Sequence, residues 1–294
     1  MRSCRQTIHS GALATLLAVG GLHLLPAPVA AAPADPRLAA VEDFAFAIGG
    51  DPNRKGRIAR LQPYDLVVID GGLASGATVA RLRGQGSIVL AYLSVGTIEP
   101  FRSWYRLLKP FRLKSRFEEF GEYYARVRSP RYRRLIRRRI APRMLRKGFD
   151  GLFLDNTDMI ETHPRQRRGM RRLVRRLAGL VHRQGDLLFA QNGEGSIKPL
   201  LSFYDGWNRE DVTWTYDFGR RRYVHRTAAN VRRALTALEN IGRAGLLVTA
   251  TDYTRAGHRA ALEESIDNAC GAGALPFVSN IALTRIPAQP PSCP

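Results

Sequence analysis

The sequence predicts an α/β protein of the (β/α)8 TIM-barrel type, built as a single domain. Three observations predict it: short apolar runs recur along the chain, amphipathic helical patterns separate several of them, and acidic or amide residues follow nearly every run. Continuous apolar runs, unlike alternating ones, are typical of parallel strands that are covered on both faces. Their alternation with helices selects the α/β class.

Seven of the apolar runs are clear enough to be predicted as strands. They lie at residues 44–48, 66–69, 88–93, 151–154, 187–190, 246–249 and 275–278. We expect an eighth strand at 206–210, where the apolar signal is weakest. Eight strands would close a barrel, and an open, doubly wound sheet of six strands is the alternative architecture.

The helical segments show a spacing of three and four between apolar positions. Residues 170–181 follow this spacing with arginines on the opposite face, and residues 231–241 follow it more weakly. Ser129 and Pro130 predict a helix start, with serine as the N-cap and proline at the first helical position. Because proline cannot continue a straight helix, Pro142 predicts a kink or break at residues 139–141.

The N-terminus has the order of zones found in secretory signal peptides. Arg2 and Arg5 precede an apolar run at residues 11–25, and small residues follow at 30–32. The run is shorter than the roughly 20 residues of a transmembrane anchor. We therefore expect a signal peptide at 1–32, a barrel domain at 33–286, a C-terminal tail at 287–294, and a secreted or periplasmic product.

Two cysteines, Cys270 and Cys293, remain after removal of the signal peptide. Export to an oxidising compartment favours a disulfide between them, and two separate buried thiols are the alternative. No zinc-binding pattern occurs, and the six histidines have no ligand spacing. We expect neither a metal nor another cofactor.

The net charge of +21 falls to +19 when Arg2 and Arg5 leave with the signal peptide. Nucleic acid is a common partner of such a basic protein, but export argues against it. The arginines concentrate at residues 131–147 and 165–183. We interpret these stretches as solvated outer helix faces; the alternative is contact with anionic envelope material, such as lipid head groups or acidic polysaccharide.

Polar residues gather where the predicted strands end. In parallel α/β proteins, functional side chains come from these C-terminal strand ends and the loops after them. The strand-end residues are Asp70, Ser94, Glu99, Asp155, Asp158, Gln191, Asn192, Glu194, Glu210, Asp252 and Tyr253. Helix capping and turns explain a few Asp and Asn residues at such places, but not a ring of this size.

Five stretches carry a family resemblance. They are AYLSVGTIEPFRSWY (91–105), GFDGLFLDNTD (148–158), AQNGEG (190–195), DGWNRED (205–211) and TDYT (251–254). In this order they resemble the blocks of the endo-α-1,4-polygalactosaminidase family of glycoside hydrolases and of related exopolysaccharide-hydrolase barrels. The resemblance spans residues 44–278 and implies a (β/α)8 barrel that makes internal cuts in polymers rich in α-1,4-linked galactosamine.

The family's acidic pair falls on Asp155 and Glu210. Glycosidic cleavage needs one carboxyl group that donates a proton and one carboxylate that attacks or activates water. We assign Asp155 as nucleophile or base and Glu210 as acid, although the roles could be exchanged. Asp155 could instead cap the next segment, Glu210 could form a surface ion pair, and Glu194 is the rival acid.

The resemblance also suggests substrate contacts and contains one departure. The expected sugar contacts are Asp70, Ser94, Glu99, Asp158, Asn192, Glu194, Asp252 and Tyr253, and the alternative for them is hydrogen bonding within the barrel rim. Further candidates, for stacking on sugar rings, are Trp104, Trp207 and Trp214. Thr97 stands where the family usually has an acid, while Glu99 and Arg102 are retained. Loss of this acid would affect a subsite for an amino sugar more than the bond-breaking pair, so it bears on the identity of the substrate more than on activity.

We therefore expect a monomer that hydrolyses an amino-sugar-rich polysaccharide. A catalytically silent barrel that binds polysaccharide or the anionic envelope is the second hypothesis. A different barrel chemistry, such as transglycosylation or use of an acidic polymer, is the third.

Overall fold

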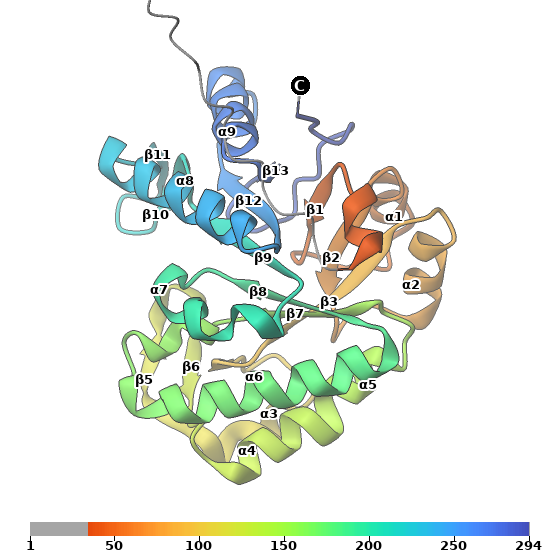
Figure 1. The fold of residues 1–294 in the computed structure, drawn as a ribbon, viewed down its shortest axis with the longest axis vertical. Helices are drawn as coiled ribbons and strands as arrows, with labels where there is room; N and C mark the ends of the chain where they lie inside the picture. The colour runs from red at the N-terminus through yellow and green to blue at the C-terminus, as the bar shows by residue number, and fades with distance from the viewer. Residues whose placement is uncertain (1–34, 294) are drawn as a thin grey trace, which may run out of the picture.

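The computed structural model describes residues 35–293, so the predicted signal peptide lies outside the described residues. Eight parallel strands pair in chain order (Figure 1). They are β1 (Phe44–Phe46), β2 (Leu66–Asp70), β3 (Ile88–Ser94), β7 (Gly151–Asp155), β8 (Leu187–Gln191), β9 (Gly206–Glu210), β12 (Leu247–Tyr253) and β13 (Leu275–Ser279). The sheet curls until Phe44 of β1 packs on Phe277 of β13, with ring centroids 6.1 Å apart. The predicted barrel is confirmed, and the open six-stranded sheet is wrong.

The eighth strand, β9, is weakly apolar for a reason that the structure explains. Asn208 in its centre is fully buried. Its side-chain oxygen accepts hydrogen bonds from Thr249 (2.8 Å) and Thr251 (3.1 Å), and its amide donates to Gln191 (3.1 Å). A buried polar group is tolerated when its hydrogen bonds are satisfied, so a core strand can carry an asparagine.

Aromatic side chains fill part of the barrel interior. The ring of Phe153 lies 5.1 Å from that of Phe46 and 6.5 Å from that of Phe189. The Phe189 ring also occupies the space that a side chain at Gly206 would need, since a Cβ there would lie 2.1 Å from it. This part of the interior is therefore packed core, and the open space lies above it, at the strand ends.

The helices follow the predicted patterns. Ser129 caps α4 (Pro130–Leu135) by accepting a hydrogen bond from the Tyr132 amide. The expected break before Pro142 is a single π turn at Ile136–Ile140, which leads into α5 (Ala141–Leu145). Proline has no N–H to donate to the preceding turn, and the wider π turn accommodates it. The chain thus continues in the same direction after Pro142.

The remaining helices surround the barrel (Figure 1). They are α1 (Lys55–Leu61), α2 (Gly76–Arg83), α6 (Arg167–Val181), α8 (Ala228–Arg243) and α9 (Arg259–Gly271). The apolar positions of α6 face the barrel, as predicted from their spacing. The connection between β8 and β9 has no long helix. It contains only the short α7 (Glu194–Ile197) and a 3-10 turn at Lys198–Phe203.

Two insertions that the apolar runs did not predict extend from barrel strands. After β3, the chain forms an antiparallel sheet of β4 (Thr97–Ile98), β5 (Arg112–Phe117) and β6 (Glu122–Ala125), with the short α3 (Tyr105–Leu108) between β4 and β5. After β9, it forms the hairpin of β10 (Trp214–Asp217) and β11 (Arg222–His225). Both leave the barrel at C-terminal strand ends, the end where a (β/α)8 barrel builds its active site.

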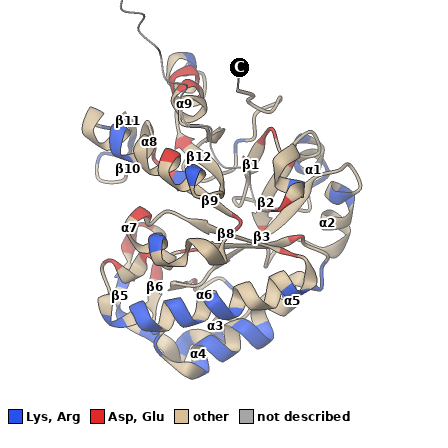
Figure 2. Ribbon diagram, in the orientation of Figure 1, with Lys and Arg blue, Asp and Glu red and all other residues tan. Residues whose placement is uncertain are grey.

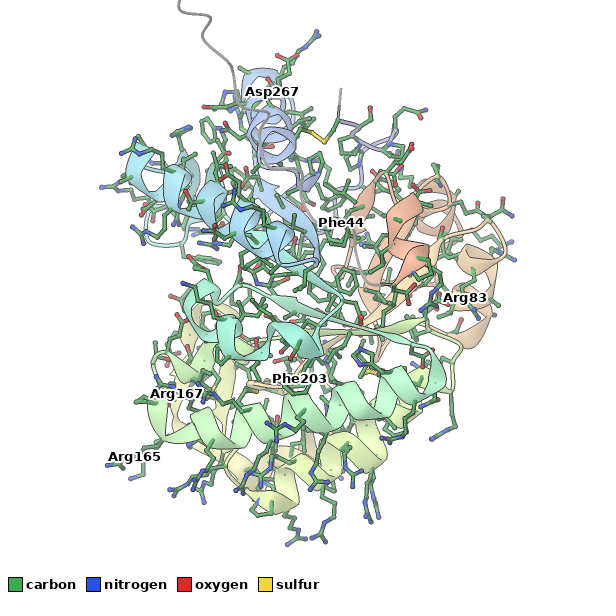
Figure 3. All side chains as sticks on the ribbon, in the orientation of Figure 1. Phe44, Arg83, Arg165, Arg167, Phe203 and Asp267 are labelled. Atoms are coloured by element: carbon green, nitrogen blue, oxygen red, sulfur yellow. A yellow bond between two sulfur atoms is a disulfide. The ribbon has the colours of Figure 1, made fainter. Side chains whose placement is uncertain are left out.

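The C-terminal segment is tied to the barrel. Cys270 in α9 and Cys293 form a disulfide, which confirms the predicted pairing (Figure 3). Within residues 35–293, no helix has the length and apolar character needed to cross a membrane.

Candidate active site

A cavity of about 390 Å³ lies at the C-terminal ends of the barrel strands, and we call it the central cavity. Seven of the predicted site residues line it: Asp70, Glu99, Asp155, Asp158, Asn192, Glu210 and Tyr253. They come from six barrel strands and the turns that follow them. The structure thus brings together most of the ring that the strand ends predicted.

Asp155, the last residue of β7, is held by hydrogen-bond donors in the cavity. The hydroxyl of Tyr92 donates to Oδ2 at 2.5 Å, and the backbone amide of Asn156 donates to Oδ1 at 2.5 Å. The Asn156 side chain donates to Oδ2 at 3.0 Å. The pKa of Asp155 is raised, because the effect of burial exceeds that of the bonds from Tyr92 and the Asn156 amide, which lower it. The donors favour the ionised carboxylate.

Glu210, the last residue of β9, is also held by hydrogen-bond donors. Gln191 and Asn192 donate to its Oε2 at 2.6 and 2.9 Å, and the Tyr253 hydroxyl donates to its Oε1. Burial raises the pKa of Glu210 to about 8, and the negative charges of Asp155 and Asp211 add to the rise. Glu210 therefore holds its proton at neutral pH, as the acid of glycosidic cleavage must, and it does so in the same cavity as Asp155.

Three neighbouring strands end in the same kind of turn. Asn156, Asn192 and Asp211 directly follow β7, β8 and β9, and their φ angles are 57°, 52° and 55°. Asn and Asp adopt this left-handed conformation more readily than other residues with side chains. Each turn reverses the chain immediately after the strand, so that the last strand residue points into the cavity. Gly96 leaves room for the first of these turns, because a Cβ there would lie 1.8 Å from the Asn156 carbonyl oxygen.

Arg102 neutralises two of the cavity carboxylates. Its guanidinium group donates to both oxygens of Asp70 at 2.6 Å and to both oxygens of Glu99, at 2.7 and 2.6 Å. All three side chains are nearly inaccessible, with 4–6% exposed. Asp70 also accepts the backbone amides of Gly72 and Leu73. These groups form a buried ion-paired wall.

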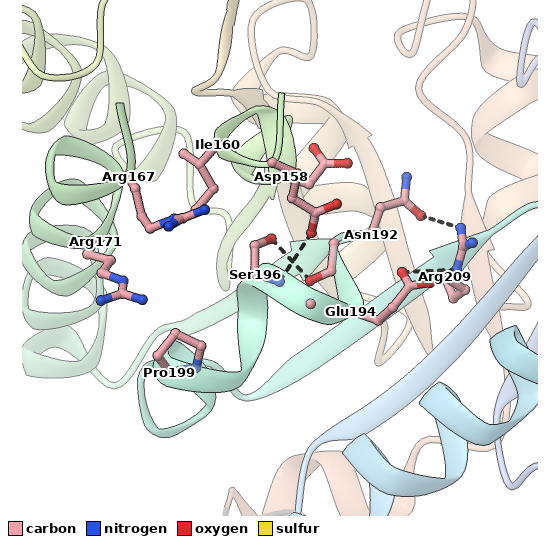
Figure 4. Close-up of a pocket in the computed structure, with 12 residues that line it drawn as sticks. Asp158, Ile160, Arg167, Arg171, Asn192, Glu194, Ser196, Pro199 and Arg209 are labelled. Atoms are coloured by element: carbon pink, nitrogen blue, oxygen red, sulfur yellow. Dashed lines mark hydrogen bonds and ion pairs between the residues drawn. The ribbon is translucent and has the colours of Figure 1, made fainter. Parts of the chain in front are cut away.

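A second, wider cavity of about 690 Å³ adjoins the first, and we call it the side groove (Figure 4). Asp158 and Asn192 line both cavities. Arg167 and Arg171 of α6 lie on one side of the groove, and Glu194 and Arg209 lie on the other, paired at 3.5 Å (Figure 4). The two cavities therefore adjoin each other at Asp158 and Asn192.

Three predicted contacts lie outside the central cavity. The Ser94 hydroxyl is buried, where it bonds Thr97 (2.6 Å) and accepts from Asn156 (3.1 Å). Glu194 lines only the side groove. The Asp252 carboxylate accepts hydrogen bonds from the backbone amides of Val212 and Thr213 and so fixes the loop after β9. The structure gives Ser94 and Asp252 positioning roles instead of direct sugar contact.

None of the three tryptophans that were candidates for stacking on sugar rings lines either cavity, and for Trp207 and Trp214 a place in the core was the equal alternative. Trp207 is fully buried in the core. Trp214 donates to Glu264 at 2.9 Å, and Trp104 packs against the core with its ring beside Arg102. The aromatic lining of the central cavity consists of Tyr92, Phe101, Phe117, Phe120 and Tyr253.

Sequence reasoning missed four residues that shape the cavity. Tyr92 and Asn156 lie inside the quoted blocks, so their position beside Asp155 was a signal that could have found them. Glu122 and Phe117 belong to the insertion after β3, which has no apolar run to mark it. Within residues 35–293, no group of three or more His, Cys, Asp or Glu side chains is arranged to hold a metal ion.

The model of glycoside-hydrolase family GH114 matches residues 26–286. The chain belongs to this family. It is accordingly a glycoside hydrolase, as the resemblance in its blocks implied. An uncharacterized protein of Deinococcus radiodurans is 24% identical to it over 267 residues, covering 85% of this chain and 84% of the relative.

Two solved structures share the fold of this GH114 protein. The glycoside hydrolase domain of PelA from Pseudomonas aeruginosa superposes with a TM-score of 0.71 at 24% identity, covering 83% of this chain and 96% of the domain. Ega3 of Aspergillus fumigatus, solved in complex with galactosamine, has a TM-score of 0.66 at 17% identity, covering 82% of this chain and 92% of Ega3. At these identities the likeness establishes the barrel fold.

Proposed function

We propose that this protein is an exported hydrolase that makes internal cuts in a polysaccharide rich in α-1,4-linked galactosamine, using Asp155 and Glu210. The observation that carries the proposal is the placement of these two carboxyl groups in one cavity, where Glu210, with a pKa of about 8, holds a proton and Asp155 accepts hydrogen bonds on both of its oxygens. The family and the galactosamine bound to Ega3 support the substrate class. An acidic cavity also suits a polycationic substrate, despite the positive charge of the whole chain.

In the proposed reaction, Glu210 donates its proton to the oxygen of the leaving sugar. Asp155 attacks the anomeric carbon or activates a water molecule, and in either case it must be ionised. Tyr92 and Asn156 hold the Asp155 carboxylate in place, while Gln191, Asn192 and Tyr253 hold Glu210. Fixed geometry of this kind lowers the cost of orienting the groups at the moment of reaction.

The shape of the site supports internal cleavage. The central cavity and the side groove share Asp158 and Asn192, so a polymer can continue beyond the cleaved bond in at least one direction. An enzyme that removed single sugars from a chain end would need only a closed pocket. We therefore expect oligosaccharides, with little free monosaccharide, among the early products.

The test measures release of reducing ends from a panel of deacetylated, N-acetylated and acidic polymers. Wild type is compared with Asp155→Asn and Glu210→Gln, and with Glu263→Gln on the surface of α9 as a matched control. We expect cleavage of the galactosamine-rich polymer by wild type and Glu263→Gln, and a loss of about 10²–10⁴-fold in the two cavity variants. Cleavage that survives both cavity replacements would contradict the assignment.

Export and the monomeric state are part of the same proposal. The basic, apolar and small-residue zones of the N-terminus support export, and the Cys270–Cys293 disulfide suits an oxidising compartment. Mass spectrometry of the protein recovered outside the cytoplasm should find an N-terminus near residue 32. Light scattering of that material should give the mass of one chain.

A second candidate function is contact with anionic envelope material through an arginine face. This face consists of the outer surfaces of α4, α5 and α6, which are rich in Lys and Arg (Figure 2). Residues 123–149 and 162–185 contain no Asp or Glu. Burial, together with Arg172 and Arg176, lowers the pKa of Arg133, which shows that arginines of the two helices repel one another.

The arginine face also contains a hollow suited to a phosphorylated head group. A cavity of about 470 Å³ is lined by Leu107, Arg131, Arg134, Leu135, Arg138 and Arg139. Arginine binds phosphate oxygens bidentately, so the four arginines of this hollow suit a phosphate group. We expect sedimentation with vesicles containing phosphatidylglycerol, and not with neutral ones, that is lost in Arg131→Gln/Arg134→Gln/Arg138→Gln. Equal binding to anionic and neutral vesicles would contradict the proposed head-group site.

A further inference from the structure

Six carboxyl groups line the central cavity: Asp70, Glu99, Glu122, Asp155, Asp158 and Glu210. Arg102 neutralises the first two, and the proposed mechanism uses Asp155 and Glu210. Asp158 stands at the junction with the side groove. The ion-paired wall and the bond-breaking pair explain neither Asp158 nor Glu122, and of these two Glu122 lines the central cavity without lining the side groove.

Glu122 begins β6 of the insertion and is enclosed on most sides. Only 8% of the residue is exposed. The Thr97 hydroxyl donates to its Oε2 at 2.6 Å, and Phe117 lies opposite it in the β5–β6 ladder. Within residues 35–293, no Lys, Arg or His forms an ion pair with Glu122, and no hydrogen bond reaches its Oε1. A free carboxylate oxygen is thus left at the cavity.

A purely structural role does not account for a carboxylate at this position. Glutamine has the same shape and would accept the same hydrogen bond from Thr97, without the cost of burying a charge that has no counterion. Burial and the charges of Glu99 and Asp155 raise the pKa of Glu122 to about 7, although the bond from Thr97 and the charge of Arg102 lower it, so the surroundings of Glu122 disfavour its ionised form. A cation bound in the cavity would reverse this cost.

The wall beside Glu122 is aromatic. The rings of Phe117 and Phe120 have their centroids 5.0 Å apart and both line the central cavity. Phe120 also lies beside Phe218, with ring centroids 5.5 Å apart, and is 50% exposed, so part of its side chain is accessible. A sugar has apolar C–H groups that pack on such a ring, and an amino sugar adds a cationic group that a carboxylate can bind. One ligand class satisfies both features.

We propose that Glu122 binds the protonated amino group of a sugar unit that packs against Phe117 and Phe120, and that Thr97 positions the carboxylate. This inference rests on the proposed function and adds to it the residue that distinguishes free amines from N-acetylated ones. Glu122 is a specificity residue, separate from the pair that breaks the bond. An insertion, and not a barrel strand, supplies it.

The direct test is binding of galactosamine and of N-acetylgalactosamine to wild type and to Glu122→Gln, measured by chemical-shift changes or calorimetry at pH 6. We expect the variant to lose at least about tenfold in galactosamine affinity, because it loses a charged hydrogen bond. Affinity for N-acetylgalactosamine should change less than twofold. Equal galactosamine affinity in wild type and variant would overturn the proposal.

Two further variants complete the design. Glu119→Gln removes the same charge from an exposed position of the same insertion, and its galactosamine affinity should equal that of wild type. Glu122→Asp keeps the charge on a shorter side chain and should retain part of the preference for the amine. If Glu119→Gln loses the preference for galactosamine over N-acetylgalactosamine as much as Glu122→Gln does, the effect is due to net charge and the proposal is overturned.

Polymer cleavage separates this inference from the proposed function. If wild type cleaves deacetylated polymer and Glu122→Gln keeps the same preference for deacetylated over N-acetylated substrate, the inference fails and the function stands. If wild type neither binds galactosamine nor cleaves any galactosamine polymer, the function fails and the inference with it. We expect Glu122→Gln to raise KM for the deacetylated polymer about tenfold or more, with a smaller change in kcat.

Discussion

The chemistry of the central cavity depends on which carboxyl group carries the proton. Asp155 and Glu210 are both shielded from water, and both accept hydrogen bonds from neighbouring side chains. Burial raises both pKa values. The negative charges of Asp155 and Asp211 raise the pKa of Glu210 further, to about 8, so that Glu210 holds its proton at neutral pH.

The first prediction concerns the pH profile. If Glu210 acts as the protonated acid, kcat/KM falls as pH rises through about 8, where Glu210 loses its proton. The Tyr253 hydroxyl donates to Glu210 and lowers its pKa. Tyr253→Phe should therefore move the alkaline limb to higher pH, whereas Tyr216→Phe, on the hairpin after β9, should leave it in place. An unmoved or lowered limb in Tyr253→Phe would contradict the acid role.

The second prediction concerns Arg102. Replacing it with methionine leaves Asp70 and Glu99 buried without their shared cation, which typically costs about 3–5 kcal/mol of unfolding free energy. Chemical denaturation should detect this loss. Arg243→Met breaks a half-exposed pair with Glu239 and should change the free energy by less than about 1 kcal/mol. Similar values for the two variants would mean that the buried wall is not stabilising.

At the scale of whole elements, the strands differ in how well the sequence predicts them. Barrel strands are covered on both faces, so residues 66–69 and 151–154 are apolar throughout and could be predicted. Strand β5 has the sequence RLKSRF and lies at the surface, where apolar patterning is not required. The insertion was therefore missed, and with it Glu122 and Phe117, although the strand-end residues Asp155 and Glu210 were found.

Side-chain partners were harder to predict than positions. Asp252 was predicted correctly at a strand end, yet it accepts backbone amides from the loop after β9. Trp207 lies next to the catalytic block in the sequence, but its ring points into the core. Position along a strand predicts which end of the barrel a residue occupies. Whether the side chain meets solvent, a loop or a ligand depends on neighbours that come from distant segments.

The third prediction concerns the disulfide that links the last helix to the C-terminal tail. The Cys270–Cys293 disulfide joins α9 to the tail and closes a loop with a sequence separation of 23. A loop of this length reduces the entropy of the unfolded chain by an amount worth about 3 kcal/mol. Cys270→Ser/Cys293→Ser should lose roughly this stability in urea, and reduction of wild type should have the same effect. A double variant as stable as oxidised wild type would contradict the prediction.

Over the whole molecule, charges are strongly segregated. The arginine face lies on the outer surfaces of α4, α5 and α6, as Figure 2 shows, while carboxyl groups gather at the C-terminal end of the barrel. A mean positive charge and a locally acidic cavity can therefore coexist. The helix layer keeps like charges in water, where they are screened, and the cavity keeps them in a less polar environment, where their pKa values rise.

The fourth prediction follows from this concentration of buried acids. The pKa is raised to about 6 for Asp252, about 7 for Glu122 and Asp158, and about 8 for Glu210. A carboxyl group with a raised pKa keeps its proton in the folded state at pH values where the unfolded chain has released it. Its stabilising contribution is complete below the unfolded value, near 4, and is lost as pH rises through the folded value.

The folded protein should accordingly be more stable at pH 5 than at pH 8. We expect a Tm at least about 3 °C higher at pH 5, since 1 kcal/mol shifts the Tm of a domain of this size by about 2–4 °C. Glutamine cannot release a proton, so Glu122→Gln/Glu210→Gln should reduce this difference, whereas Glu119→Gln/Glu263→Gln should preserve it. A Tm that rises from pH 5 to pH 8 would mean that these carboxyl groups are ionised in the folded state, and the acid role of Glu210 would fail with it.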